Sequence, residues 1–96
     1  MKVVITGASK GIGKAIALKF ANDGHDLAIC SRNLTDLTLL KEQIHSIHPD
    51  LDVYVSVTDV SKKEEVLDFS NAVVKHFGSI DVLINNAGVF LPGKIS

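Results

Sequence analysis

The sequence predicts an α/β protein in which a parallel β-sheet carries helices on its faces, and two observations lead to this fold class. Short apolar runs rich in β-branched residues alternate with longer segments in which apolar residues recur at helical spacing. The elements follow the order strand, helix, strand, helix, strand, helix, strand, which repeated right-handed βαβ units produce. With 96 residues the chain can bury one core, so residues 1–96 are expected to form a single domain.

The expected strands are the four apolar runs, each of which is too short to form a helix. They cover residues 3–5, 27–30, 53–57 and 82–84. Because a helical segment separates each run from the next, the strands are expected to pair in parallel.

Three segments between these strands carry apolar stripes at helical spacing and are expected to form helices. The stripes are Ile12, Ile16 and Phe20, then Leu34, Leu37, Leu40, Ile44 and Ile47, then Val66, Phe69, Val73 and Phe77. Gly24 and Gly78 follow the first and third helices, and Pro49 stops the second. Ser61 and Glu64 have the spacing of a capping box, so they are expected to open the third helix.

Composition and charge argue against several kinds of partner. The formal net charge is −1, with acidic and basic residues interspersed, so we expect no nucleic-acid or membrane surface. The apolar start ends at Gly7, and no apolar run reaches the ~18 to 20 residues that a membrane span needs. A cytoplasmic protein without a signal peptide is therefore expected.

Few residues could bind a metal or act as a nucleophile. The single cysteine, Cys30, lies in an apolar stretch and is expected to be a buried, unreactive thiol. His45 and His48 are three residues apart, but no third ligand stands at a suitable spacing. We therefore expect no metal site.

The first strand leads into the first helix through a turn that contains Gly7, Gly11 and Gly13. A helix start has four unpaired N–H groups and a partial positive charge, so a turn without bulky side chains can bind an anion there. Lys10 and Lys14 lie around the first helical turn, where a cation opposes the helix dipole unless an anion is bound. The turn therefore predicts a phosphate site, although a tight turn with solvated lysines would have the same sequence.

Two standard phosphate motifs do not match this turn. The Walker A loop needs four residues between its glycine and the Gly-Lys pair, whereas five separate Gly7 from Gly13, and Ala15 follows Lys14. The strict dinucleotide pattern G-x-G-x-x-G fails as well, because Ile16 stands where its third glycine belongs.

The remaining pattern, Thr6-Gly7-x-x-x-Gly11-x-Gly13, resembles the cofactor loop of the short-chain dehydrogenase/reductase family. Two further segments are similar to that family's motifs, namely Asn85-Asn86-Ala87-Gly88 after the fourth strand and Asp59-Val60 after the third. The resemblance covers essentially the whole chain. It implies the amino-terminal cofactor-binding half of a classical member, with a Rossmann-like doubly wound parallel sheet truncated to four strands and three helices. The implied strand order is third, second, first, fourth.

The resemblance also implies a role for each matching residue in binding a nicotinamide dinucleotide. Gly7, Gly11 and Gly13 would surround the pyrophosphate, and the backbone of Ile12 would reach it. Asp59, with Val60, would meet the adenine, whereas Asn86, Ala87 and Gly88 would line the nicotinamide ribose. Asn85 resembles the residue that pins the central strands together. All these residues are expected at the carboxyl ends of parallel strands, where a doubly wound sheet binds its ligand.

The end of the second strand predicts which dinucleotide binds. A site that prefers NAD(H) places an acid there to accept the ribose hydroxyls, but residues 30–33 contain none. Arg32 resembles the family's basic residue for a 2′-phosphate, and Ser9, Lys10 and Asn33 are near enough in the pattern to assist. The sequence therefore predicts NADP(H) as the preferred cofactor, with NAD(H) as the other possible one.

No catalytic residue is assigned to this chain. The family's serine, its tyrosine with a lysine four residues later, and its assisting asparagine would all lie downstream of residues 85–88. Tyr54 is in the third strand with Thr58 four residues on, so it is expected to be a sheet residue. The resemblance thus implies the cofactor-binding portion of an oxidoreductase for an unknown small carbonyl or alcohol substrate, inactive by itself.

Two alternatives stay open at this point. A non-catalytic nucleotide-binding or assembly module would carry the same motifs without reductase activity. A flavodoxin-like or receiver domain would show the same alternation of elements, but a receiver needs clustered acids where Thr6 and Gly7 stand.

The fourth strand is expected at an edge of the sheet, with an uncharged core at residues 82–84 that contains no proline. Such an edge presents unpaired N–H and C=O groups that another chain can bind. The sequence therefore predicts a homo-oligomer, unless residues 90–95 fold back over this edge.

Overall fold

Four parallel strands form the centre of the computed structural model, which describes residues 1–7 and 11–86. The strands are β1 (Lys2–Thr6), β2 (Asp26–Ser31), β3 (Val53–Val57) and β4 (Val82–Asn85). They lie in the order β3-β2-β1-β4, and each neighbouring pair is parallel. The predicted strands and their order are therefore confirmed.

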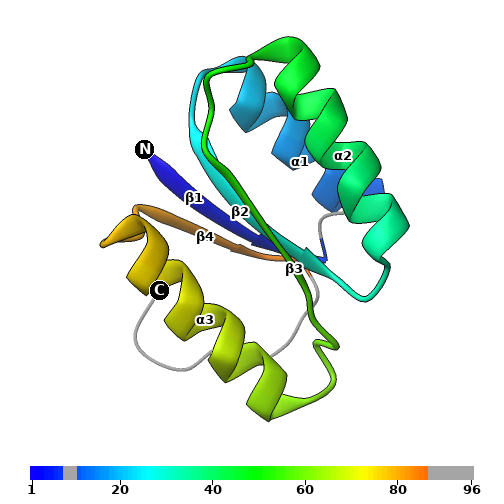
Figure 1. The fold of residues 1–96 in the computed structure, drawn as a ribbon, viewed down its shortest axis with the longest axis vertical. Coiled ribbons are helices and arrows are strands. Elements are labelled where there is room, and N and C mark those ends of the chain that lie inside the picture. Colours follow the sequence, from blue (N-terminus) through cyan, green and yellow to red (C-terminus); the bar gives the residue numbers. More distant parts are fainter. Residues whose placement is uncertain (8–10, 87–96) are drawn as a thin grey trace.

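Three helices cover both faces of this sheet. The helices α1 (Gly11–Asn22) and α2 (Leu34–Ile47) lie side by side on one face, and α3 (Lys63–Phe77) lies on the other (Figure 1). This arrangement is the predicted Rossmann-like doubly wound sheet, because the chain moves to the opposite face after β3.

The core consists of two apolar clusters, one on each face of the sheet. Beneath α1 and α2, the cluster includes Ile5, Ile29, Leu37 and Ile44, each with 0% of its surface exposed. Beneath α3, it includes Val4, Cys30, Phe69 and Val73. The strand β2 contributes to both clusters because it lies between two other strands, where apolar residues point to both faces.

The helical stripes predicted from the sequence are correct in α3 and only partly correct in the other two helices. Leu34 and Ile47 are 60% and 45% exposed because they lie at the two ends of α2, beyond the sheet. In α1, Ile12 is 73% exposed, and the buried face is formed by Gly13, Ala17 and Ala21 instead. Small residues let α1 approach the sheet closely, so the larger residues Ile16 and Phe20 pack only at the margin of that contact.

The start of α3 differs from the predicted capping box. The residue before the helix is Lys62, and its side chain makes no capping hydrogen bond. Ser61 instead donates its hydroxyl to Asp59 Oδ1 at 2.6 Å, and Glu65 accepts the N–H of Asp59 at 2.8 Å. The predicted capping box is wrong because Glu65, and not Glu64, accepts the hydrogen bond from the loop that precedes α3. The predicted end of α3 is confirmed, since Gly78 has φ of +79° and donates its N–H to Val74.

Candidate functional site

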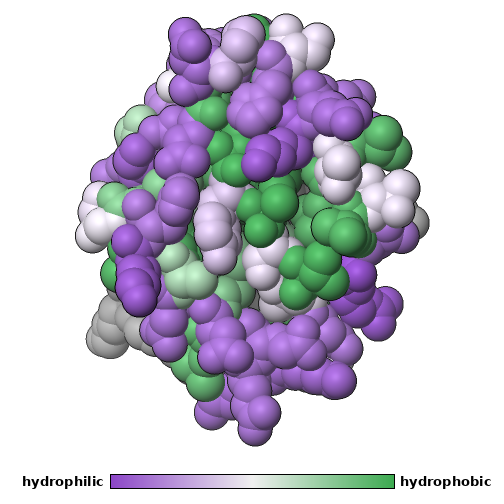
Figure 2. Space-filling view, in the orientation of Figure 1, coloured by the Kyte–Doolittle hydropathy of each residue, from purple (hydrophilic) through white to green (hydrophobic). Residues whose placement is uncertain are grey.

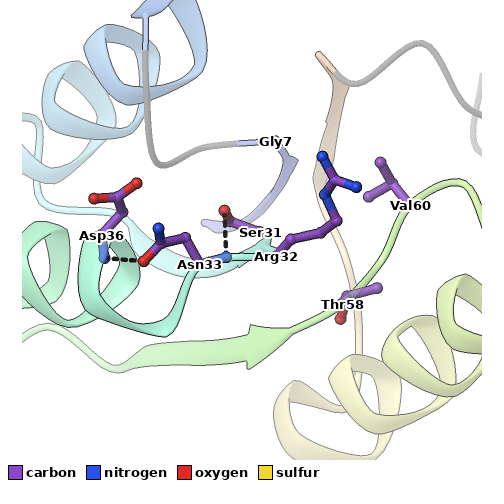
Figure 3. A pocket seen from close by; sticks show the side chains of 7 residues that line it. All are labelled: Gly7, Ser31, Arg32, Asn33, Asp36, Thr58 and Val60. Atoms are coloured by element: carbon purple, nitrogen blue, oxygen red, sulfur yellow. Dashed lines mark hydrogen bonds between the residues drawn. The ribbon is translucent and has the colours of Figure 1, made fainter.

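A cavity of about 410 Å³ opens where β1, β2 and β3 end. Seven residues line it (Figure 3): Gly7, Ser31, Arg32, Asn33, Asp36, Thr58 and Val60. Gly7 follows β1, and Thr58 and Val60 follow β3. Ser31 ends β2, and Arg32, Asn33 and Asp36 lie between β2 and the first turn of α2. Three strand ends and one helix start therefore meet at this cavity. The carboxyl edge of a doubly wound sheet is the position where ligands of such folds bind.

Backbone hydrogen bonds that continue the sheet hold these strand ends together. The N–H of Gly7 donates to the carbonyl of Cys30 at 3.1 Å, and that of Thr58 donates to Ser31 at 2.8 Å. Gly7 has φ of +66°, a backbone conformation that a side chain disfavours. Two backbone hydrogen bonds therefore fix the cavity wall to the end of β2.

The start of α2 forms the polar wall of the cavity. Asn33 caps the helix, since its Oδ1 accepts the N–H of Asp36 at 3.0 Å. The N–H of Asn33 in turn donates to Ser31 Oγ at 3.3 Å. Capping uses the amide oxygen of Asn33, so the part of its side chain left for a ligand is the Nδ2 donor.

Arg32 lies in the turn between β2 and α2, and it is the only arginine of the sequence. Its side chain is exposed, and Figure 3 shows its guanidinium reaching across the cavity toward Val60. A guanidinium presents several N–H donors in a plane, a geometry that matches phosphate oxygens. This wall can therefore bind an anion through Arg32 and Asn33.

Asp59 lies beside the cavity without lining it. Its Oδ1 accepts two hydrogen bonds from Ser61, one from the hydroxyl at 2.6 Å and one from the N–H at 3.0 Å. The hydrogen bond from the Ser61 hydroxyl, and to a smaller extent the one from its N–H, hold the pKa of the Asp59 carboxyl below its ordinary value. The carboxylate is thus ionised at neutral pH and can accept a further hydrogen bond through Oδ2.

The end of β4 is tied to the end of β1 by two side chains. The buried hydroxyl of Thr6 donates to Asn85 Oδ1 at 3.0 Å. Asn86 Nδ2 donates to the carbonyl of Gly7 at 3.1 Å. The last residue of β4, Asn85, and the residue that follows it, Asn86, therefore contact the end of β1 and Gly7, although neither lines the cavity.

The structure brings together some of the predicted site residues but not all. Gly7, Arg32, Asn33 and Val60 line the cavity, and Gly11, Ile12 and Gly13 begin α1. Ser9, Lys10, Ala87 and Gly88 lie outside the described residues. The sequence prediction missed three lining residues, Ser31, Asp36 and Thr58. Ser31 and Thr58 could have been found, because each ends or follows a strand at the carboxyl edge of the sheet.

Other predicted features can be compared with the residues that the structure describes. Cys30 is buried as expected, and burial raises the pKa of its thiol to about 11. Within residues 1–7 and 11–86, no three His, Cys, Asp or Glu side chains group in a way that could hold a metal ion. No helix in these ranges is long and apolar enough to cross a membrane.

Comparisons with known proteins identify the family. The family model for short chain dehydrogenases matches residues 1–96. The chain is 43% identical over 82 residues to NADPH-dependent reductase BacG of Bacillus subtilis, covering 85% of this chain and 32% of BacG. This protein therefore belongs to the short-chain dehydrogenase family.

Solved structures agree in fold. The crystal structure of YwfH, described as an NADPH dependent reductase involved in bacilysin biosynthesis, superposes with a TM-score of 0.86 at 40% identity. That match covers 96% of this chain and 35% of YwfH. A metagenomic short-chain oxidoreductase in complex with NADP gives a TM-score of 0.83 at 32% identity, covering 93% of this chain and 39% of that one. The chain thus spans only about a third of the length of the proteins that it matches.

Proposed function

We propose that residues 1–96 are the dinucleotide-binding part of an NADP(H)-dependent oxidoreductase that acts on a carbonyl or alcohol substrate. The observation that carries this proposal is the cavity at the carboxyl ends of β1, β2 and β3, with Arg32 on its wall. The residue that follows β2 is this arginine, where an NAD(H)-preferring site would have an acid. NAD(H) is the weaker cofactor in this proposal.

The residues of the cavity fit the adenosine ribose and its 2′-phosphate. Arg32 supplies a cation, and Nδ2 of Asn33 together with the helix start of α2 supplies further donors. Thr58 and Val60 form the opposite wall, beside Asp59, which would receive the adenine amino group. Relatives named for NADPH or solved with NADP support this assignment.

The rest of the dinucleotide would follow the strand ends toward β4. Gly11, Ile12 and Gly13 begin α1, so their backbone would receive the pyrophosphate, assisted by Ser9 and Lys10. The segment of Asn86, Ala87 and Gly88 would line the nicotinamide ribose, because Asn86 is bonded to the glycine turn. The nicotinamide, when bound, supplies or accepts the hydride.

We propose that the chain alone does not catalyse the reaction. The second candidate function is therefore that of a non-catalytic nucleotide-binding module. The chain's one tyrosine, Tyr54, lies in β3, and its ring packs 5.1 Å from that of His76 at the far end of α3. Tyr54 is the second residue of β3, near the amino end of that strand, whereas the proposed nicotinamide segment follows the carboxyl end of β4, so Tyr54 is not positioned to donate a proton there. A carbonyl next to the nicotinamide would therefore receive no general acid from Tyr54.

Titration with two nucleotides tests the proposed cofactor. Adenosine 2′,5′-bisphosphate and AMP differ only in the 2′-phosphate, and both need only the adenosine end of the site. We expect the chain to bind the bisphosphate about tenfold more tightly than AMP in isothermal titration calorimetry, as one charge-assisted hydrogen bond provides. Equal affinities would overturn the assignment to NADP(H), and binding of neither nucleotide would overturn the proposed function.

We also propose that the chain pairs with a second copy through β4. In the described part of the sheet, β4 is an edge strand (Figure 1). Its residues Val82, Leu83 and Ile84 are half-buried. The opposite edge, β3, has Val57 52% exposed, and Figure 2 shows apolar side chains gathering on the middle of the face seen in that view. Unpaired strand edges next to apolar surface favour association.

The expected result is a molar mass of about twice that of one chain in light scattering at high micromolar concentration, falling on dilution. A mass that stays monomeric across the concentration series would contradict this proposal. The predicted fold-back of residues 90–95 lies outside the described residues, and a monomeric mass would favour it.

A further inference from the structure

We infer that Glu65 is a positioning residue for the adenine segment of the site, by which we mean residues 58–60. Glu65 lies on α3 and does not line the cavity. It instead holds the backbone of Asp59, which stands between the two cavity-lining residues Thr58 and Val60 (Figure 3). This inference rests on the proposed function, in which Asp59 receives the adenine amino group.

Two backbone N–H groups fix the adenine segment, one to the sheet and the next to α3. Thr58 is buried, and its N–H donates to the carbonyl of Ser31 at 2.8 Å. One residue later, the N–H of Asp59 donates to Oε1 of Glu65 at 2.8 Å. The partner thus changes from β2 to α3 within two residues, and the bond to Glu65 is the one directly before Val60.

The other hydrogen bonds of Asp59 lie within its own turn. Its carbonyl accepts the N–H of Lys62 at 3.0 Å, and its Oδ1 accepts the hydroxyl and the N–H of Ser61. These bonds give the turn its shape, but they come from residues that move with it. Glu65 belongs to the first turn of α3, next to the buried Val66, so its bond ties the turn to a helix packed on the core. A binding group keeps its place when residues around it lock its position, and Glu65 supplies that support for Asp59.

Glu65 also forms an ion pair, which gives a competing explanation of its role. Its Oε2 lies 3.9 Å from Nζ of Lys62, and the two side chains are 40% and 66% exposed. An exposed pair of this kind contributes little, whereas a carboxylate that accepts a backbone N–H forms a strong, charge-assisted bond. A substitution that removes the charge but keeps an oxygen acceptor therefore separates the two roles.

The preference for AMP over purine riboside 5′-monophosphate tests the inference, because the two nucleotides differ only in the exocyclic amino group of AMP. We expect the parent chain to bind AMP about tenfold more tightly in isothermal titration calorimetry, as one hydrogen bond to a carboxylate provides. In Glu65→Ala this preference is expected to fall to about two- to threefold, because Asp59 is no longer held in place. Glu65→Gln keeps an oxygen acceptor for the Asp59 N–H and is expected to stay within about twofold of the parent preference.

The preference for adenosine 2′,5′-bisphosphate over AMP serves as an internal control. It is expected to change less than about twofold in both variants, because Arg32 would bind the 2′-phosphate and follows β2, not β3. Glu64→Ala is the matched control variant, since it removes an exposed carboxylate from the same turn of α3. It should leave both preferences unchanged. If Glu65→Ala does not fold, as judged by circular dichroism, Glu65→Met replaces it, because it keeps the length of the side chain without an oxygen acceptor.

The outcomes separate this inference from the proposed function. An unchanged preference for AMP in Glu65→Ala overturns the inference, and so does equal weakening of AMP and its analogue, which indicates a purely structural role. Equal losses of preference in Glu65→Ala and Glu65→Gln overturn it as well, because the charge and not the acceptor would then matter. If the parent chain binds AMP and its analogue equally but prefers the bisphosphate, the inference fails and the proposed cofactor stands. If the parent chain binds none of these nucleotides, the proposed function fails and the inference fails with it.

Discussion

Replacing Arg32 with alanine is expected to weaken the binding of adenosine 2′,5′-bisphosphate by about tenfold, while the affinity for AMP changes less than about twofold. A charge-assisted hydrogen bond to a phosphate contributes roughly 1.5 to 3 kcal/mol, which corresponds to about 10- to 150-fold in affinity. Arg32 is exposed, so solvent screening places the effect at the lower end of this range. Isothermal titration calorimetry of both nucleotides against the variant and the parent chain measures it.

Lys19→Ala is the matched control for the loss of one positive charge. Lys19 lies in the last turn of α1, and its side chain is 73% exposed. This control should leave both affinities unchanged. Equal weakening of the two nucleotides by Arg32→Ala would show that Arg32 supports the cavity wall instead of binding the phosphate.

The sequence predicted the sheet well because the physical rules for its strands are local. The apolar run at residues 27–30 lies within β2, whose buried residues reach both apolar clusters. Residues 82–84 likewise lie within β4, although only a short segment pairs there. A run of β-branched and apolar residues between helical segments leaves few other conformations, so the order of elements followed from the pattern alone.

Packing partners could not be predicted in the same way. The exposure of Ile12 and the burial of Gly13 depend on how closely α1 approaches the sheet, a distance that hydrophobic periodicity does not encode. At the start of α3, the N–H of Asp59 donates to Glu65 and not to Glu64. Tertiary geometry decides which of two neighbouring acids accepts such a hydrogen bond, so the sequence spacing of a capping box cannot predict it.

In the candidate site, too, some residues could be predicted from the sequence and others could not. Gly7 and Arg32 were identified from motifs, and both line the cavity. Asp36 carried no signal, because an acid in the first turn of a helix is common for reasons of stability alone. Only the three-dimensional arrangement places its carboxylate on the wall that Arg32 shares.

The largest effect on stability is expected from Ile29→Ala. Ile29 is in the middle of β2, is 0% exposed, and packs in the cluster beneath α1 and α2. Truncating a buried isoleucine to alanine costs about 2 to 5 kcal/mol, because apolar contacts are lost and a cavity remains. A folded chain of this size has roughly 5 to 14 kcal/mol of total stability, so this loss is a large share of it.

Ile47→Ala removes the same atoms from a position at the end of α2 that is 45% exposed, so it controls for the change in side-chain chemistry. Its free energy of unfolding is expected to fall by less than about 1 kcal/mol, as for most surface substitutions. Urea unfolding followed by circular dichroism compares the two variants. Similar losses in both would contradict the placement of Ile29 in the apolar cluster beneath α1 and α2. A selective loss in Ile29→Ala would also show that the strand carrying Ser31 to the cavity is held in place by packing beneath α1 and α2.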